Sequence, residues 1–250
     1  MPDIEISLVD RIQVLRINRP AKKNALTSEM YAALSSALED GDADSDVSAH
    51  VILGSGGVFT AGNDIHDFLK TAQGSPGLGV EVLRFIHLLP IVGKPLIAGA
   101  DGAAIGIGTT LLLHCDLVYA SDRAQFSTPF LNLGLVPEAA SSWLMPQRMG
   151  YARAFELLVL GNTFSAAQAL QAGLVNAVVP ANELEATVMD AARRLAGKPA
   201  AALAAARRLM RGDAAPILKR TGEEAKAFAQ QLATPEAKAA FESFLNKSRG

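Results

Sequence analysis

The chain has 250 residues, of which 50% are hydrophobic, and this proportion is enough to bury a substantial core in one or two domains. Its 23 basic and 25 acidic residues nearly cancel, which leaves a formal net charge of -2. Since binding to nucleic acid needs a basic face, this balance argues against nucleic acid as a partner.

The single cysteine and the N-terminus bear on the cellular compartment. Cys115 lies in an apolar run and has no second cysteine with which to form a disulfide in the chain, so a reducing compartment fits. The first residues lack the basic start and long apolar stretch of a signal peptide, and no apolar run approaches the roughly 20 residues that cross a bilayer. We therefore expect a cytoplasmic protein without a membrane partner, in which Cys115 packs as a small hydrophobic residue.

The N-terminal part predicts a hairpin, a helix and a buried strand. Apolar residues at 4–8 and 12–17 flank a turn at Asp10–Arg11, which is typical of two paired strands. Thr27 precedes an apolar stripe and predicts the cap of a helix that ends near residue 40. A buried strand at 51–53 then enters a glycine-rich loop, and residues 58–65 turn towards another helix.

The rest of the chain alternates strands and helices before becoming helical. Expected elements in chain order are a helix at 82–89, a strand at 94–100, a glycine turn at 102–108, an apolar helix at 109–114 and a strand at 117–120. This alternation through about residue 180 indicates an α/β fold. After Pro180 we expect four helices, at 182–196, 200–210, 216–232 and 235–247. Basic residues in these helices fit solvated faces, with contacts to the phosphates of a ligand as the alternative.

The turn at 102–108 has three glycines between a strand and a helix, at Gly102, Gly106 and Gly108. A dinucleotide-binding turn would need a further glycine where Thr110–Leu111 stands, so that interpretation is disfavoured. The backbone N–H of Ile107 at the start of the following helix is a donor for negative charge. Tight packing of helix against sheet is the structural alternative.

A second turn of the same kind lies at 61–65, where Gly62 exposes the backbone N–H of Asn63. Two such donors that converge on one oxygen make an oxyanion hole. Loss of one donor from such a hole costs about 3 kcal/mol of transition-state stabilisation in an enzyme where it has been measured.

These turns, in their order along the chain, resemble the crotonase superfamily, also called the enoyl-CoA hydratase/isomerase family. The resemblance runs from about residue 5 to 245 and rests on several separated segments: Arg19–Pro20, Asn24–Leu26, Phe59–Ile65, Asp101–Gly108, Cys115–Ala120, Ala166–Ala169 and Ala172–Val175. It implies a crotonase-type spiral of ββα units over residues 1–195. It also implies a helical region over 196–250 that builds trimers, often stacked as hexamers.

The resemblance further implies an acyl-coenzyme A substrate and no separate cofactor, because coenzyme A is part of the substrate. The N–H groups of Asn63 and Ile107 would hold the thioester oxygen. Further substrate contacts are expected at Lys22, Ala61, Asp64, Ile65, Gly106 and Phe130. For Asp64 a helix cap is the alternative that we favour, and no metal site is expected.

The acid–base residues decide which reaction of this family to expect. The two glutamates of its hydratases fall at Thr110 and Phe130 here, so neither position is a carboxylate. Glu138 matches the single catalytic glutamate of the Δ3,Δ2-enoyl-CoA isomerases, and one base is enough to move a proton from C2 to C4. Burial of this glutamate would raise its pKa, and the apolar neighbours expected around it are Phe130, Leu135 and Trp143.

Glu138 also has a structural interpretation, as an acid in the first turn of a helix that begins at Pro137. Two further functions stay open beside the isomerase. One is a hydratase-like or other crotonase-type lyase or hydrolase, and the other is a non-catalytic acyl-CoA-binding protein. We expect the segment from Gly74 to Gly79 to cover the acyl end of the substrate.

Overall fold

The structure is a computed structural model that describes residues 2–65, 69 and 78–247. Its strands in chain order are β1 (Ile4–Val9), β2 (Ile12–Ile17), β3 (Ala49–Gly54), β4 (Leu96–Ala100), β5 (Ala103–Ile105), β6 (Leu117–Ser121), β7 (Gln125–Ser127), β8 (Phe164–Ser165) and β9 (Ala177–Val179). Its α-helices are α1 (Ser28–Ala43), α3 (Val80–Leu88), α4 (Ile107–Thr110), α5 (Ser141–Met149), α6 (Tyr151–Leu158), α7 (Ala166–Gln171), α8 (Leu184–Ala196), α9 (Ala200–Arg211), α10 (Ala215–Leu232) and α11 (Pro235–Lys247). Short 3-10 helices are η1 (Pro20–Lys22), η2 (Leu89–Ile91), η3 (Leu111–His114) and η4 (Leu131–Leu133).

The main sheet has the strand order β1-β2-β3-β4-β6-β9 in the described part of the chain. β1 and β2 form the expected antiparallel hairpin, with Ile4 opposite Ile17, and every later neighbour pair is parallel. A smaller sheet has the order β5-β7-β8. The expected α/β fold is therefore confirmed. The helix expected at 109–114 is instead the end of α4 followed by η3, and α1 continues to Ala43.

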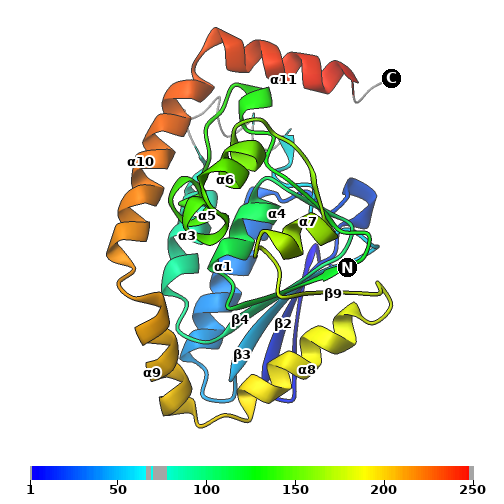
Figure 1. Cartoon of the computed structure of the whole chain (residues 1–250), viewed down its shortest axis with the longest axis vertical. Helices are drawn as coiled ribbons and strands as arrows, with labels where there is room; N and C mark the ends of the chain where they lie inside the picture. The colour runs from blue at the N-terminus through cyan, green and yellow to red at the C-terminus, as the bar shows by residue number, and fades with distance from the viewer. Residues whose placement is uncertain (1, 66–68, 70–77, 248–250) are drawn as a thin grey trace.

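Alternation along the strands assigns the two faces of the main sheet. In β2, Ile12 and Val14 face the layer formed by α8, whereas Leu15 and Ile17 belong to the main core with α1. The period of two puts apolar residues on both faces, as a sheet covered on each side by helices requires. Figure 1 shows α8 lying across one face of the strands, with α1 and α3 on the other side.

The four C-terminal helices are confirmed, with bounds close to those expected. α9, α10 and α11 follow one another along the outside of the molecule (Figure 1). They are attached to the main core, because Phe228 of α10 and Phe241 of α11 are buried in it. A separate unit over 196–250 stays a prediction. No helix in the described residues is long and apolar enough to cross a membrane.

The loop that carries the Asn63 turn is held by Asn24. This side chain is fully buried, and its amide donates to the carbonyl oxygens of Ser55 (2.9 Å) and Val58 (2.7 Å). Its own oxygen accepts the N–H of Arg19 at 2.9 Å. Its φ of 56° lies in the left-handed region, which asparagine tolerates better than most residues. One buried amide thus joins residues 19–24 to the segment that leads into Gly62.

Replacing Asn24 by alanine should lower the free energy of unfolding by about 3 kcal/mol, because two carbonyl groups lose their donor and alanine is strained at this φ. Urea unfolding followed by circular dichroism measures the change. Lys22→Ala, an exposed change two residues away, should alter stability by less than about 0.5 kcal/mol. Equal stabilities of the two variants would contradict the role given to Asn24.

Candidate active site

The two glycine turns expected to act together lie against each other. A Cβ built on Gly62 would sit 2.8 Å from the carbonyl oxygen of Ile105, so only glycine fits there, and its φ of 87° also favours glycine. Thr60 and Ala104 form a parallel bridge, and the N–H of Ile105 donates to the carbonyl oxygen of Thr60 at 3.0 Å. The segments around residues 62 and 106 are therefore neighbours, as an oxyanion hole built from both requires.

Each turn offers a backbone donor. Ile107 is the first residue of α4, so its N–H has no carbonyl group one turn earlier to bind. Gly106 before it has a φ of 58°, and beyond its chain neighbours no atom of the described residues lies within 4 Å of the place where its Cβ would be. Among the described residues, the backbone hydrogen bonds outside helices and strands include the N–H of neither Asn63 nor Ile107. Within the part of the chain that the structure describes, both N–H groups can therefore donate to a ligand.

Tyr31 of α1 holds the side chain of Asn63. Its hydroxyl donates to Asn63 Oδ1 at 2.5 Å, and the ring is 1% exposed. Burial raises the pKa of Tyr31 well above its ordinary value, and the negative charge of Glu138 raises it further. Tyr31 therefore stays protonated and keeps its role as donor. Tyr31 thus bonds to the Asn63 side chain and also responds to the charge of Glu138.

Glu138 is the buried carboxyl group of the site, with only 2% of the residue exposed. Burial raises its pKa from 4.5 to about 8, because the charged form loses its hydration. The hydroxyl of Thr110 donates to Glu138 Oε1 at 2.5 Å and opposes that rise, whereas the charge of Glu224 adds to it. Thr110 is the last residue of α4, the helix that begins at Ile107, so this one turn of helix brings a free N–H and the carboxyl group to the same site.

The turn that carries Glu138 has an unusual backbone. Ala139 and Ala140 both have left-handed φ values, 57° and 55°, and both are fully buried. Such a conformation costs a non-glycine residue about 1–2 kcal/mol, so tertiary contacts have to hold it. α5 begins only at Ser141, and the interpretation of Glu138 as an acid in the first turn of a helix is therefore wrong.

His114 supports this turn from η3. Its Nε2 lies 2.8 Å from the carbonyl oxygen of Ala139. Burial lowers the pKa of His114 to about 4, so the ring is neutral near pH 7. Since a carbonyl oxygen only accepts, Nε2 carries the proton and donates it to Ala139.

The three apolar residues expected around Glu138 differ in their burial. Phe130 and Leu135 are buried, at 7% and 5% exposure. Trp143, expected beside them, is 42% exposed, so the prediction that it helps to bury Glu138 is wrong. It lies on the outer side of α5, where the guanidinium group of Arg220 stands 5.4 Å from the centre of its ring.

The structure shows where most of the other residues expected to contact a substrate lie. Ala61 and Ile65 are half-buried beside the Asn63 turn. Asp64 forms an ion pair of 2.7 Å with Arg19 and is 13% exposed, so it joins the two loops as well. Lys22 is exposed in η1. Contacts of all these residues with a substrate stay predictions. His66 and most of the segment from Gly74 to Gly79 lie outside the described residues.

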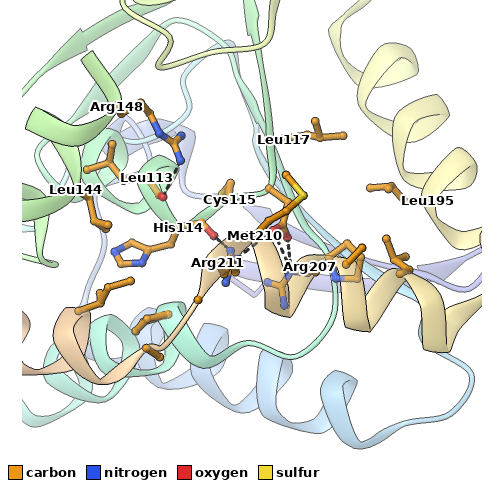
Figure 2. Close-up of a pocket in the computed structure, with 18 residues that line it drawn as sticks. Leu113, His114, Cys115, Leu117, Leu144, Arg148, Leu195, Arg207, Met210 and Arg211 are labelled. Atoms are coloured by element: carbon orange, nitrogen blue, oxygen red, sulfur yellow. Dashed lines mark hydrogen bonds and ion pairs between the residues drawn. The ribbon is translucent and has the colours of Figure 1, made fainter. Parts of the chain in front are cut away.

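A pocket of about 480 Å³ lies elsewhere, between η3 and α9, and its lining contains none of the residues Asn63, Ile107 or Glu138. Figure 2 shows Arg148 and Arg211 turned towards the main chain of η3, where they donate to the carbonyl oxygens of Leu113 and His114. Arg207 and Arg211 both pair with the carboxylate of Asp116, at 2.8 and 3.1 Å. These two basic residues therefore attach α9 to the core. This differs from the solvated face that we expected.

Within the described ranges, no three His, Cys, Asp or Glu side chains form a metal site.

Three polar partners of the site were not identified from the sequence. Thr110 stands out in the sequence only as a position without a carboxylate, Tyr31 falls outside the apolar stripe expected for its helix, and Glu224 lies in a C-terminal helix from which no site residue is expected. A polar residue within a predicted buried surface is the signal that each of them carries. Their partners are far away in sequence, so the signal alone does not identify the contacts.

The chain is similar to known proteins over nearly its whole length. Residues 9–249 match the sequence profile of the family described as Enoyl-CoA hydratase/isomerase. "Enoyl-CoA delta isomerase 2" of Rattus norvegicus is 38% identical over 217 residues, which cover 85% of this chain but only 55% of that protein. "2,3-dehydroadipyl-CoA hydratase" of Escherichia coli K12 is 30% identical over 248 residues, 99% of this chain and 97% of that one.

A solved structure agrees with these sequence similarities. The enoyl-CoA hydratase/isomerase of Pseudoalteromonas atlantica T6c superposes with a TM-score of 0.92 at 39% identity, over 98% of both chains. A match of this extent confirms the crotonase-type fold expected from the sequence.

The raised pKa of Glu138 predicts how stability depends on pH. The folded protein keeps this proton between pH 4.5 and about 8, whereas the unfolded chain releases it, so Glu138 loses its stabilising effect as the pH rises through that range. The folding equilibrium constant of the wild type, relative to Glu138→Gln, should fall up to about tenfold per pH unit between about pH 5 and pH 8 and then level off. Urea unfolding of both proteins across that range measures it.

Glu223→Gln is the matched control, since Glu223 is half-exposed in its ion pairs with Lys219 and Arg220. Its stability should stay close to that of the wild type, because a half-exposed ion pair contributes little. A difference for Glu138→Gln that stays flat with pH would show that Glu138 has an ordinary pKa.

Proposed function

Since the chain belongs to the enoyl-CoA hydratase/isomerase family, we propose that it is a Δ3,Δ2-enoyl-CoA isomerase, which moves a double bond of an acyl-CoA from C3 to C2. One observation carries this proposal: the buried carboxyl group of Glu138 accepts a hydrogen bond from the hydroxyl of Thr110, which stands where a hydratase would have its first glutamate and belongs to the helix that begins at Ile107. The similarity to an enoyl-CoA delta isomerase supports it.

In the proposed mechanism, one carboxyl group moves one proton. The Glu138 carboxylate takes a proton from C2, and the electron pair of that C–H bond forms a dienolate whose negative charge lies on the thioester oxygen. The N–H groups of Asn63 and Ile107 stabilise that charge. The Glu138 carboxylic acid then returns the proton to C4, and the double bond remains between C2 and C3. No water enters the reaction and no redox cofactor is needed.

The environment of Glu138 suits this proton shuttle. A base works best when its pKa is near the working pH, and burial places the pKa of Glu138 at about 8. The same burial excludes the water that would otherwise compete for the proton. Both properties follow from the 2% exposure of the residue.

Hydration is the less favoured reaction because it needs a second acid–base group to activate water. Thr110 and Phe130 stand at the two hydratase positions, and the hydroxyl of Thr110 is already engaged with Glu138. The other buried acid nearby, Glu224, accepts two backbone N–H groups. Similarity to a hydratase keeps hydration, or another crotonase-type lyase or hydrolase reaction, as the alternative, and non-catalytic acyl-CoA binding as a third.

Several expectations about the whole protein belong to the same proposal. The substrate is an acyl-CoA thioester, and Lys22 is exposed on η1, where its charge suits the phosphates of coenzyme A. The remaining contacts, at Ala61, Asp64, Ile65, Gly106 and Phe130, border the thioester and acyl positions. We further propose a homotrimer or hexamer in the cytoplasm.

Glu138→Gln should reduce the conversion of a 3-enoyl-CoA to its 2-enoyl isomer by about 10²–10⁴-fold, because the amide cannot take the proton. The rate is followed as the rise of ultraviolet absorbance of the conjugated thioester. Binding of the saturated acyl-CoA, measured by calorimetry, should change little, and Glu223→Gln should keep the wild-type rate.

Full activity of Glu138→Gln would contradict the proposed role of Glu138 as the base. Hydration of 2-enoyl-CoA at a rate comparable to isomerisation would favour the hydratase-like alternative. Tight binding without turnover on a panel of 3-enoyl and 2-enoyl thioesters would favour the binding protein.

The pH profile gives an independent check. Because the base must be ionised, kcat/KM of the wild type should rise about tenfold per pH unit up to about pH 8 and then level off. Thr110→Val removes the hydroxyl that lowers the pKa of Glu138, so its rise should extend to higher pH. Steady-state rates from about pH 6 to pH 10 show the shift, and coincident profiles of the two proteins would rule out this contact.

A further inference from the structure

Glu224 of α10 is a buried acid to which the mechanism gives no task. Only 6% of the residue is exposed. One carboxylate oxygen accepts the N–H of Ala140 at 2.6 Å, and the other accepts the N–H of Ser142 at 2.9 Å. These partners are 84 and 82 residues away in sequence, in the turn that follows Glu138. α10 passes beside α5 along the outside of the molecule (Figure 1).

The turn from 138 to 142 depends on contacts of this kind. Ala139 and Ala140 are in the left-handed region, and neither has a side chain that can bond its own backbone. Ala140 also precedes α5 without any capping side chain. Glu224 supplies the missing acceptor from another helix, and both of its oxygens are used. Two charge-assisted hydrogen bonds from one carboxylate fix both the orientation of the turn and its distance from α10.

The turn is held on two sides. His114 donates to the carbonyl oxygen of Ala139 from η3, and Glu224 accepts the N–H of Ala140 from α10. Glu138 stands immediately before this clamped pair, and its carboxyl group has to meet the hydroxyl of Thr110. A shift of the turn would move the carboxyl group relative to Thr110 and to the donors at residues 63 and 107.

We propose that Glu224 is a positioning residue, which aims the carboxyl group of Glu138 by clamping the left-handed turn at Ala139–Ala140 from the C-terminal helical region. The proposal rests on the proposed function in one respect, that Glu138 is the base. In this proposal α10 contributes to the reaction by positioning the base, and Glu224 itself takes no proton.

The charge of Glu224 acts on the same group. It raises the pKa of Glu138, after the larger effect of burial and against the hydrogen bond from Thr110. Around Glu224 itself, burial raises the pKa, whereas the donors at Ser142 and Ala140 and the cation of Arg220 lower it. Tyr31 is the other titratable group that responds to the charge of Glu138. Removing the Glu224 charge should therefore lower the pKa of Glu138.

The test compares Glu224→Ala and Glu224→Gln with the matched control Glu223→Gln. In Glu224→Ala the turn is freed, and kcat for isomerisation should fall about a hundredfold while KM changes less than about threefold. Glu224→Gln keeps one acceptor and the shape, so kcat should fall by less than about tenfold, and its rise with pH should occur at lower pH than in the wild type. Glu223→Gln should match the wild type in both respects.

Hydrogen–deuterium exchange of the peptide spanning residues 138–144 tests the clamp without reference to activity. Exchange should become faster in Glu224→Ala and stay unchanged in Glu223→Gln. This measurement separates the two proposals. An inactive wild type, or an active Glu138→Gln variant, would contradict the proposed function. Faster exchange in Glu224→Ala would still support the clamp.

A folded Glu224→Ala protein with wild-type kcat and wild-type exchange would overturn the positioning role. If that variant fails to fold, Glu224→Gln decides, because a wild-type kcat and an unshifted pH profile would overturn it equally. An equal loss of kcat in Glu223→Gln would show that α10 acts through general stability and would also overturn it.

Discussion

The site depends on the burial of one carboxyl group, that of Glu138, away from water. Glu138 is nearly unexposed, and burial raises its pKa from 4.5 to about 8. A charged group in such a place is costly unless it is paired, so the protein either keeps it protonated or surrounds it with donors. Here the hydroxyl of Thr110 is the side-chain donor that the described residues provide, and the carboxyl group can change its charge near its raised pKa of about 8.

The backbone near Glu138 is arranged so that its N–H groups can stabilise negative charge that develops on a ligand. Gly62 and Gly106 have left-handed φ values, and among the described residues no backbone carbonyl group outside helices and strands accepts the N–H of Asn63 or Ile107. The close approach at Ile105 leaves no room for a side chain on Gly62. Tyr31 and Asn24 hold the first of these turns through side-chain hydrogen bonds. Donors fixed in advance need no rearrangement when negative charge develops. Loops held by buried side-chain hydrogen bonds, next to a buried acid, are therefore the main feature of the site.

The C-terminal helices complete the arrangement. α9 is attached to the core by Arg207 and Arg211 at Asp116, and α10 reaches the Glu138 turn through Glu224. Since this fold is shared by proteins described as isomerases and as hydratases, its architecture leaves the reaction open. The acid–base groups and their positioning contacts distinguish one chemistry from another.

The sequence by itself determined the α/β alternation, the hairpin, the four C-terminal helices and the paired glycine turns, because apolar periodicity and glycine positions are local signals. It also singled out Glu138 as a candidate base. Only the tertiary structure decided that Trp143 lies on the outside, that Glu138 precedes its helix, and that Thr110, Tyr31 and Glu224 meet around one turn. The reason is physical: hydrogen bonds between residues tens of positions apart, such as Glu224 to Ala140, follow from how helices pack and leave no trace in local sequence patterns.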